Sequence, residues 1–410
     1  MKNIQTFPKG FYWGAATASY QVEGGIENTD WAKAAREGRV PECGRACDHY
    51  NRYEADFDLA KELGHNAHRF SIEWARIEPE EGQWNYEEVE HYRKVIKALK
   101  DRGLKPYITL WHFTVPQWFA DKGSFEYKNS PEYFARYAQF IAKELGDELD
   151  GLKTINEPIV VAGLGWLKGN WPPFKQFSLV ELNELTVSGD REMQRPVKSL
   201  FAYFTYRKVV KNIARAHILA YESIKAVQPN FDVSLVKHVV AFDANANPFN
   251  KIRAWAEDQL LNHSFLKKVH RYCDSFGLNF YHYVKFGNRP NFEHSDMGWE
   301  MAPAGIYNAL KVLWKYKKPI FISECGVADY DDSHRAWYIE EQIKGVAHAL
   351  QDGIDIRGHM YWSLMDNYEW ALGFEKKFGL IEIDYDTLER KIRPSAWVYK
   401  QLIEKYSKVK

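Results

Sequence analysis

The sequence predicts a single (β/α)8 TIM barrel with its active site at the C-terminal ends of the strands. Eight short apolar segments that suit strands alternate with longer segments whose apolar residues recur at helical spacing. Such alternation is typical of a parallel sheet covered by helices, and eight repeats favour a closed barrel over an open sheet. No glycine fingerprint of a dinucleotide fold follows the first strand, which removes the main reason to choose an open sheet.

The predicted elements follow one another in regular order. Strands are expected at residues 11–17, 66–72, 105–110, 151–157, 233–236, 275–281, 319–324 and 356–363. Helices are expected at residues 51–63, 86–102, 130–145, 206–227, 254–266, 303–316, 332–351 and 393–406. Gly64 and Gly103 suit the ends of the first two helices, and Pro131 suits the first turn of the third. Because no linker or repeat divides the sequence, residues 1–410 are predicted to form one catalytic domain, with a long insertion at about 159–200.

The composition narrows the class of function. With 45% hydrophobic residues, the chain of 410 residues can form the core of a large barrel. Its 55 basic residues balance its 55 acidic ones, and this neutrality argues against a nucleic-acid or anionic-membrane binder. Aromatic residues make up 16% of the chain, a high share that favours a cleft in which flat apolar faces such as sugar rings stack.

Cysteine usage and the N-terminal residues favour a cytoplasmic location. The first residues lack the apolar segment of a signal peptide, and no run of eighteen apolar residues is present, so no membrane span is predicted. Four cysteines in so long a chain fit a reducing compartment. Cys43, Cys47 and His49 are close in sequence, but no second ligand pair follows at the spacing of a zinc site. These cysteines are therefore interpreted as free thiols, and no metal site is predicted.

Two predicted strands of the same character end in a carboxylate. The fourth ends in Asn156 and Glu157, with Pro158 preventing further strand pairing, and the seventh ends in Glu324. Either end alone is most simply an ordinary strand end at the surface. The fourth and seventh strands of an eight-stranded barrel lie on opposite sides, however, so both side chains can reach its mouth. Paired carboxylates suit glycoside hydrolysis, where one protonates the leaving oxygen and the other attacks the anomeric carbon or activates water, depending on their separation.

Polar and aromatic residues stand at nearly every predicted strand exit. They are Gln21, Arg69, His112, Asn156, Glu157, Asn279, Tyr281, Glu324, Trp362 and Glu369. Taken singly, these residues have structural explanations, such as a salt bridge, a satisfied core histidine or ordinary packing. Their convergence on one rim is what favours an active site. For Trp166 and Trp171, within the insertion, the sequence does not separate a wall of the leaving-group site from a stabilising lid.

The segments that carry these residues resemble glycoside hydrolase family 1, the β-glucosidase and β-galactosidase group. The resemblance runs through the whole chain and is strongest to the shorter archaeal-type members. It rests on residues 11–24, 69–74, 110–116, 154–158 (TINEP), 322–326 (ISECG) and 361–370. One residue departs from the family pattern, because Cys325 follows Glu324 where most members have asparagine. We expect Cys325 to pack behind the nucleophile and to tune activity without abolishing it.

The resemblance implies a retaining β-glycosidase with Glu157 as acid/base and Glu324 as nucleophile, acting through a covalent glycosyl-enzyme. Its substrates would be terminal β-D-glucosyl residues, together with β-D-galactosyl or β-D-fucosyl residues. Substrate binding is assigned to Gln21, His112, Asn156, Tyr281, Trp362, Glu369 and Trp370, and supporting roles to Arg69, Asn279 and Phe378. Neither a metal nor an organic cofactor is implied. The expected partner is a β-glycoside or oligosaccharide, without nucleic acid, and a homo-oligomer is compatible with the sequence.

Three alternative functions stay open. The nearest is a 6-phospho-β-glycosidase, but the charge of Glu369 would repel a phosphate and Phe378 stands where a tyrosine would help to bind one. Lys376 and Lys377 are close by, although basic residues beside a site are weak support. A non-catalytic sugar-binding relative would usually have lost one glutamate, and this chain keeps both. A transglycosylase would use the same residues as a hydrolase, so the sequence does not separate the two.

Overall fold

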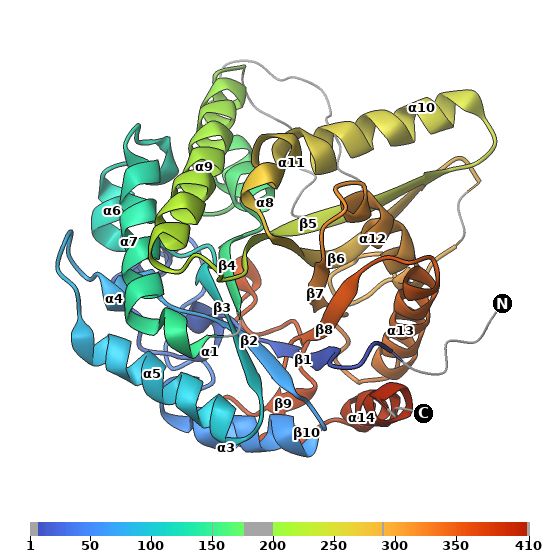
Figure 1. Cartoon of the computed structure of the whole chain (residues 1–410), viewed down its shortest axis with the longest axis horizontal. Helices are drawn as coiled ribbons and strands as arrows, with labels where there is room; N and C mark the ends of the chain where they lie inside the picture. The colour runs from blue at the N-terminus through green and yellow to red at the C-terminus, as the bar shows by residue number, and fades with distance from the viewer. Residues whose placement is uncertain (1–6, 150, 176–199, 289–290, 408–410) are drawn as a thin grey trace.

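The computed structural model describes residues 7–149, 151–175, 200–288 and 291–407. Eight parallel strands form a closed barrel in chain order, and the eighth pairs with the first. They are β1 (Tyr12–Ala16), β2 (Ala67–Ser71), β3 (Lys105–Trp111), β4 (Gly151–Asn156), β5 (Val233–Ala244), β6 (Ser275–Phe286), β7 (Ile320–Cys325) and β8 (Ile356–Trp362). Figure 1 shows the strands at the centre and the helices around them. The predicted (β/α)8 fold is confirmed.

Long helices cover the outside of the barrel, and short ones lie in the connections. They are α1 (Ser19–Val22), α2 (Asp30–Arg36), α3 (His49–Glu62), α4 (Trp74–Ile77), α5 (Tyr86–Asp101), α6 (Gln117–Asp121), α7 (Ser130–Leu145), α8 (Pro158–Ala162), α9 (Leu200–Val227), α10 (Pro248–Glu257), α11 (Ser264–Val269), α12 (Ile306–Trp314), α13 (Arg335–Gln351) and α14 (Pro394–Ser407). Among the described residues, no helix combines the length and the apolarity needed to cross a membrane.

Helix α5 illustrates how the sequence produces a covering helix. Its N-cap residue, Asn85, accepts hydrogen bonds from the backbone N–H groups of Glu87 and Glu88, which would otherwise lack partners in the first turn. Val89 and Ile96 recur at helical spacing and are buried against the barrel. The glutamates of the first turn also oppose the positive end of the helix dipole.

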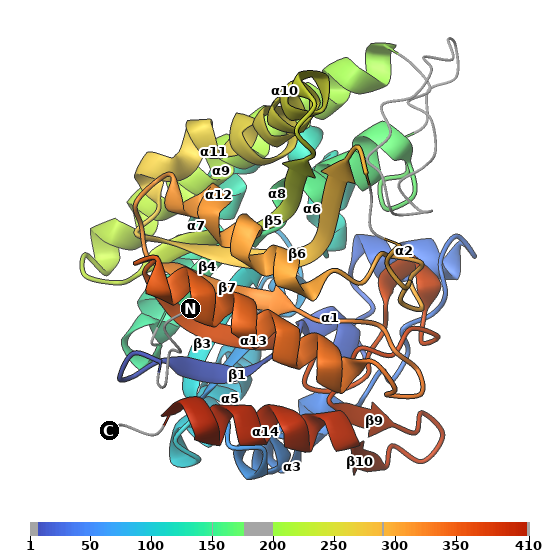
Figure 2. The same ribbon diagram turned by 90° about the vertical axis from the view of Figure 1, so that its right-hand side faces the viewer.

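Strands β5 and β6 are longer than the sequence predicts. The expected ends at residues 236 and 281 are wrong, because pairing continues to Ala244 and Phe286. The two strands therefore form a ribbon beyond the barrel, and Figure 2 shows them rising side by side toward α10. A register shift between His238 and Val240 interrupts the pairing near the base of this ribbon. Such a bulge changes the direction of neighbouring side chains.

Some connections also differ from prediction. The helix expected at 254–266 is divided into α10, a π-helical turn at Asp258–His263, and α11. An unpredicted antiparallel hairpin, β9 (Ile381–Ile383) and β10 (Arg390–Ile392), follows the eighth strand. Of the predicted insertion at 159–200, the structure describes α8, the π-helical turn Gly163–Lys168 and the chain through residue 175. Residues 176–199 of that insertion lie outside the described residues.

All four cysteines are buried free thiols. Cys43 Sγ donates to the carbonyl oxygen of Tyr20, and Cys47 Sγ donates to that of Asp366, each at 3.0 Å. Burial raises the pKa of every one of these thiols. Cys325 Sγ lies 3.0 Å from His359 Nε2, and alternation along β7 places it on the opposite face of the strand from Glu324.

Candidate active site

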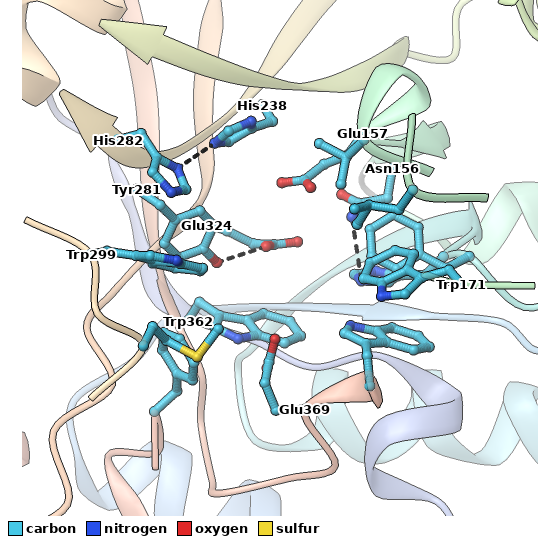
Figure 3. Close-up of a pocket in the computed structure, with 17 residues that line it drawn as sticks. Asn156, Glu157, Trp171, His238, Tyr281, His282, Trp299, Glu324, Trp362 and Glu369 are labelled. Carbon is cyan, nitrogen blue, oxygen red and sulfur yellow. Dashed lines mark hydrogen bonds between the residues drawn. The ribbon is translucent and has the colours of Figure 1, made fainter. Parts of the chain in front are cut away.

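A pocket at the carboxyl ends of the strands brings together most of the residues singled out in the sequence (Figure 3). Nine of them line it: His112, Asn156, Glu157, Tyr281, Glu324, Trp362, Glu369, Trp370 and Phe378. The other three, Gln21, Arg69 and Asn279, are buried and bond to residues of the lining or their immediate neighbours. The lining comes from strands far apart in the sequence, because parallel strands bring all their carboxyl ends to one rim.

Three residues of the lining have a left-handed backbone. Glu157 has φ of 46°, Phe113 has φ of 75° and Trp370 has φ of 50°. Side chains other than glycine rarely adopt this region, and such strain tends to gather at functional sites. Glu157 stands between the end of β4 and Pro158, the first residue of α8. Its carboxyl group points across the pocket toward that of Glu324 (Figure 3).

Glu157 lies where a carboxyl group keeps its proton. Asn279 Nδ2 donates to Glu157 Oε1 at 2.7 Å, and only 8% of the residue is exposed. Burial, reinforced by the negative charge of Glu324, raises the pKa of Glu157 to about 8. At neutral pH this carboxyl group is therefore protonated and can serve as a general acid.

Glu324 lies where a carboxylate is favoured. Arg69 Nη1 donates to Glu324 Oε1 at 2.5 Å, and Tyr281 Oη donates to Oε2 at 2.8 Å. Arg69 is itself held by Thr109 Oγ1 and by Asn156 Oδ1, each at 2.9 Å, so its guanidinium group is fixed although it is buried. Burial raises the pKa of the Tyr281 hydroxyl, which therefore remains a donor. Both contacts to Glu324 are charge-assisted, the stronger kind of hydrogen bond.

Aromatic rings and a neutral histidine form the wall next to these carboxyl groups. The His112 ring lies nearly parallel to Trp362 and Trp370, with interplanar angles of 19° and 15°. His112 Nε2 lies 3.3 Å from Asn156 Nδ2, and burial lowers the pKa of His112, which keeps its ring neutral. Its Nδ1 has no hydrogen-bond partner among the described residues. Flat rings beside unpaired polar atoms suit a sugar.

Gln21 is held in place from the loop after β8. Its Nε2 donates to Asn367 Oδ1 at 2.9 Å and to the Tyr368 carbonyl oxygen at 2.7 Å. The amide oxygen of Gln21 finds no partner in the part of the chain that the structure describes. Glu369, next along that loop, lines the pocket and is half-buried. These hydrogen bonds hold the loop after β8 against the segment that follows β1.

Eight residues of the lining were not predicted from the sequence. They are Phe113, Val160, Leu164, Trp171, His238, His282, Met297 and Trp299. Of the two tryptophans left undecided, Trp171 lines the pocket, whereas Trp166 is only 2% exposed and is not part of that lining. Trp171 packs against Phe113 and Trp370, at ring-centroid distances of 5.0 and 5.6 Å.

Comparison with known proteins shows similarity to one family along nearly the whole chain. The family model of glycosyl hydrolase family 1 matches residues 3–275 and 269–408. Beta-glucosidase A of Acetivibrio thermocellus is 32% identical, over 97% of this chain and 98% of that protein. The beta-galactosidase of Saccharolobus solfataricus, an archaeal relative, is 28% identical over 97% of this chain and 95% of its own length.

Solved structures agree with these relatives. A beta-glycosidase from Pyrococcus horikoshii has a TM-score of 0.84 at 32% identity, covering 100% of this chain and 99% of that one. The beta-glucosidase from Thermotoga maritima in complex with noeuromycin has a TM-score of 0.85 at 28% identity, covering 99% and 100% of the two chains. Sequence and structure therefore point to one family.

Proposed function

This chain belongs to glycosyl hydrolase family 1, and on that basis we propose that it hydrolyses terminal β-D-glucosyl residues with Glu157 as acid/base and Glu324 as nucleophile. The chain is a glycoside hydrolase of the retaining class to which the family belongs. Relatives named beta-glucosidase and beta-galactosidase support glucosides as the first substrates to test and galactosides as the second.

The contrast between the surroundings of the two glutamates carries this proposal. Arg69 and Tyr281 donate to Glu324 and favour its charged form. Glu157 receives no comparable positive partner within hydrogen-bond distance in the described part of the chain, and burial holds its proton at neutral pH. A retaining glycosidase needs one ionised carboxylate and one protonated carboxyl group, and different surroundings provide both in one pocket.

The reaction would proceed in two displacements. In the first, Glu324 attacks the anomeric carbon, the bond from that carbon to the leaving oxygen breaks, and Glu157 protonates this oxygen. In the second, Glu157 takes a proton from water, the water oxygen attacks the anomeric carbon, and the ester bond to Glu324 breaks. Esterification removes the negative charge of Glu324, which is one cause of the raised pKa of Glu157. The same group can therefore act as acid first and as base second.

The remaining polar groups would hold the sugar. The free amide oxygen of Gln21 and the free Nδ1 of His112 can each pair with a hydroxyl group. Asn156 would donate to the 2-hydroxyl, a contact that strengthens in the transition state, and Trp362 would lie beneath the sugar ring. Glu369 would bind further hydroxyls as an acceptor.

Two observations favour an unphosphorylated sugar. The carboxylate of Glu369 lines the pocket, where it would repel a 6-phosphate. Lys377, a candidate phosphate ligand in the sequence, lies instead over the ring of Tyr385, 4.6 Å from its centroid. Neither Lys376 nor Lys377 belongs to the lining of the described pocket.

A panel of aryl β-glycosides tests the proposal: glucoside, galactoside, fucoside, mannoside and 6-phosphoglucoside, with the first-formed anomer followed by NMR. We expect turnover of the glucoside, with the β-anomer appearing first. Turnover of only the phosphorylated sugar would overturn the role given to Glu369. An α-anomer formed first would contradict the two-displacement mechanism, and folded protein without any turnover would favour a sugar-binding relative.

A further inference from the structure

Two histidines in the pocket have no part in the mechanism above. His238 of β5 and His282 of β6 line the pocket and are 7% and 8% exposed. His238 Nε2 lies 3.1 Å from His282 Nδ1, a hydrogen-bond distance, and Figure 3 draws the bond. The other nitrogen of the second ring, His282 Nε2, is buried and has no partner among the described residues. A buried polar atom without a partner, on a residue that lines a pocket, is a candidate to bond with a ligand there.

The bond between the two rings determines what the free nitrogens can do. Burial lowers the pKa of both histidines, to about 4 for His282, so both rings are neutral at physiological pH. Two neutral rings share one proton across the contact. If His238 donates, His282 Nε2 carries a hydrogen and is a donor; if His282 donates, its Nε2 is an acceptor. The pair can therefore match a hydroxyl group in either role, whereas a carboxylate could only accept from it and an apolar group could do neither.

The position of the pair points to the leaving group. His238 is on β5, the strand next to β4, and the proposed acid/base Glu157 directly follows β4. In register, His238 pairs with Asn279, and His282 lies three residues farther along β6, toward the ribbon outside the barrel. In the view of Figure 3, the pair lies on the same side of Glu324 as Glu157, with Trp362 and Glu369 on the other side. Because Glu157 lies on this side of Glu324, we expect the leaving group that receives its proton to bind on the same side.

Trp299 completes this part of the wall. Its ring packs against His282 with centroids 4.6 Å apart, and it also contacts Tyr281 at 5.6 Å. A flat apolar ring beside a neutral hydrogen-bonding group is the combination that binds a sugar ring and one of its hydroxyls. Tyr281 and His282 come from β6 and Trp299 from the chain that follows it, and all three line the pocket on the side where Tyr281 contacts Glu324.

We propose that His282, held in place by His238, binds a hydroxyl group of the leaving unit and so directs the enzyme toward β-linked disaccharides and oligosaccharides rather than aryl or alkyl glycosides. This inference rests on the proposed function and specifies the substrate class on the leaving-group side. His282 makes the contact through Nε2, and His238 acts through His282 as a positioning residue.

The decisive experiment compares kcat/KM for cellobiose with kcat/KM for p-nitrophenyl β-D-glucoside, because the two substrates share the glucosyl unit and differ in the leaving group. In His282→Phe the ratio of cellobiose to aryl glucoside should fall roughly tenfold or more, since the phenyl ring fills the space but cannot pair with a hydroxyl. His282→Asn, which keeps donor and acceptor, should restore most of the ratio. His65→Phe is the matched control, because His65 is equally buried, has no partner among the described residues and lies outside the pocket.

A second measurement uses the unaltered enzyme with cellobiose analogues in which one hydroxyl of the reducing glucose is replaced by hydrogen. One such analogue should lose roughly tenfold in kcat/KM, and His282→Phe should no longer distinguish it from cellobiose. The inference is overturned if every analogue reacts like cellobiose, if the ratio in His282→Phe stays within about twofold of wild type, or if both substrates fall together. Failure of wild type on both substrates would instead contradict the proposed function.

Discussion

Replacing Glu157 by glutamine should stabilise the protein at alkaline pH and leave it nearly unchanged at acid pH. The side chain of Glu157 is buried, and its pKa is raised from 4.5 to about 8. In the unfolded chain the carboxyl group ionises near its ordinary pKa, so between pH 5 and pH 8 only the folded state keeps the proton. The stability that this proton contributes is present at low pH and is lost as the pH rises through about 8.

The size of the stability difference follows from the pH range over which only the folded state keeps the proton. Three pH units between pH 5 and pH 8, at 1.36 kcal/mol each, correspond to about 4 kcal/mol as an upper limit. Glutamine has no proton to lose, and its amide oxygen can still accept from Asn279. Relative to wild type, Glu157→Gln should therefore gain up to about 4 kcal/mol in free energy of unfolding between pH 5 and pH 9.

Urea unfolding of both proteins at pH 5 and pH 9 measures this difference, because all other titrations are common to the two chains. The same samples should show that Glu157→Gln hydrolyses cellobiose far more slowly than wild type. The loss should be much smaller for an aryl glucoside whose leaving group needs no proton. A difference in stability between the two proteins that does not change with pH would refute the assignment of a protonated, buried Glu157.

Three further predictions concern the same pocket. Glu324→Gly should lower hydrolysis of every substrate by roughly 10⁴-fold or more while circular dichroism and thermal unfolding stay close to wild type, and residual turnover near wild type would show that another group is the nucleophile. Tyr281→Phe removes a 2.8 Å bond to Glu324 and should lower kcat/KM roughly tenfold or more at an unchanged fold; kcat/KM within twofold of wild type would contradict the supporting role. Lys237→Met removes a positive charge that lowers the pKa of Glu157, so the alkaline limit of kcat/KM should move to higher pH. Lys153 is also buried but is not among the main charges that act on Glu157, so Lys153→Met should leave this limit nearly in place. An equal shift in both lysine variants would exclude a specific effect of Lys237.

The barrel could be predicted because its signal is repeated eight times. Apolar segments of strand length and helices ended by residues such as Gly64 and Gly103 fix the order of elements, and that order leaves few topologies. The ends of β5 and β6 could not be predicted in the same way. Lys237 and His238 interrupt the apolar run and indicate a strand end, but both are buried, and the pairing of β5 with β6 continues past them to Ala244.

The unpredicted length of β5 and β6 is also the reason why part of the pocket could not be predicted from the sequence. Glu157 and Glu324 are recognisable in the sequence because each stands at the end of an apolar strand and belongs to a family motif. His238 and His282 stand within strands for which the sequence predicts earlier ends, and each alone is the pattern of an ordinary core histidine. Their contact depends on a bulge and on the pairing of β5 with β6, which are properties of the folded sheet. Trp166 and Trp171, five residues apart, are both buried, and only Trp171 lines the pocket.

Because all four cysteines are buried, the reactivity of their thiols can be used to follow unfolding. A thiol reacts with maleimide or with an aromatic disulfide only as an accessible thiolate, and here both accessibility and ionisation are suppressed. The native protein should therefore be silent toward such reagents, and each thiol that becomes reactive should mark the opening of its own part of the barrel. Cys43 and Cys47 report on the chain after β1, Cys273 on the approach to β6, and Cys325 on β7, the strand of Glu324. The order in which mass spectrometry finds them labelled would give the order in which the barrel comes apart.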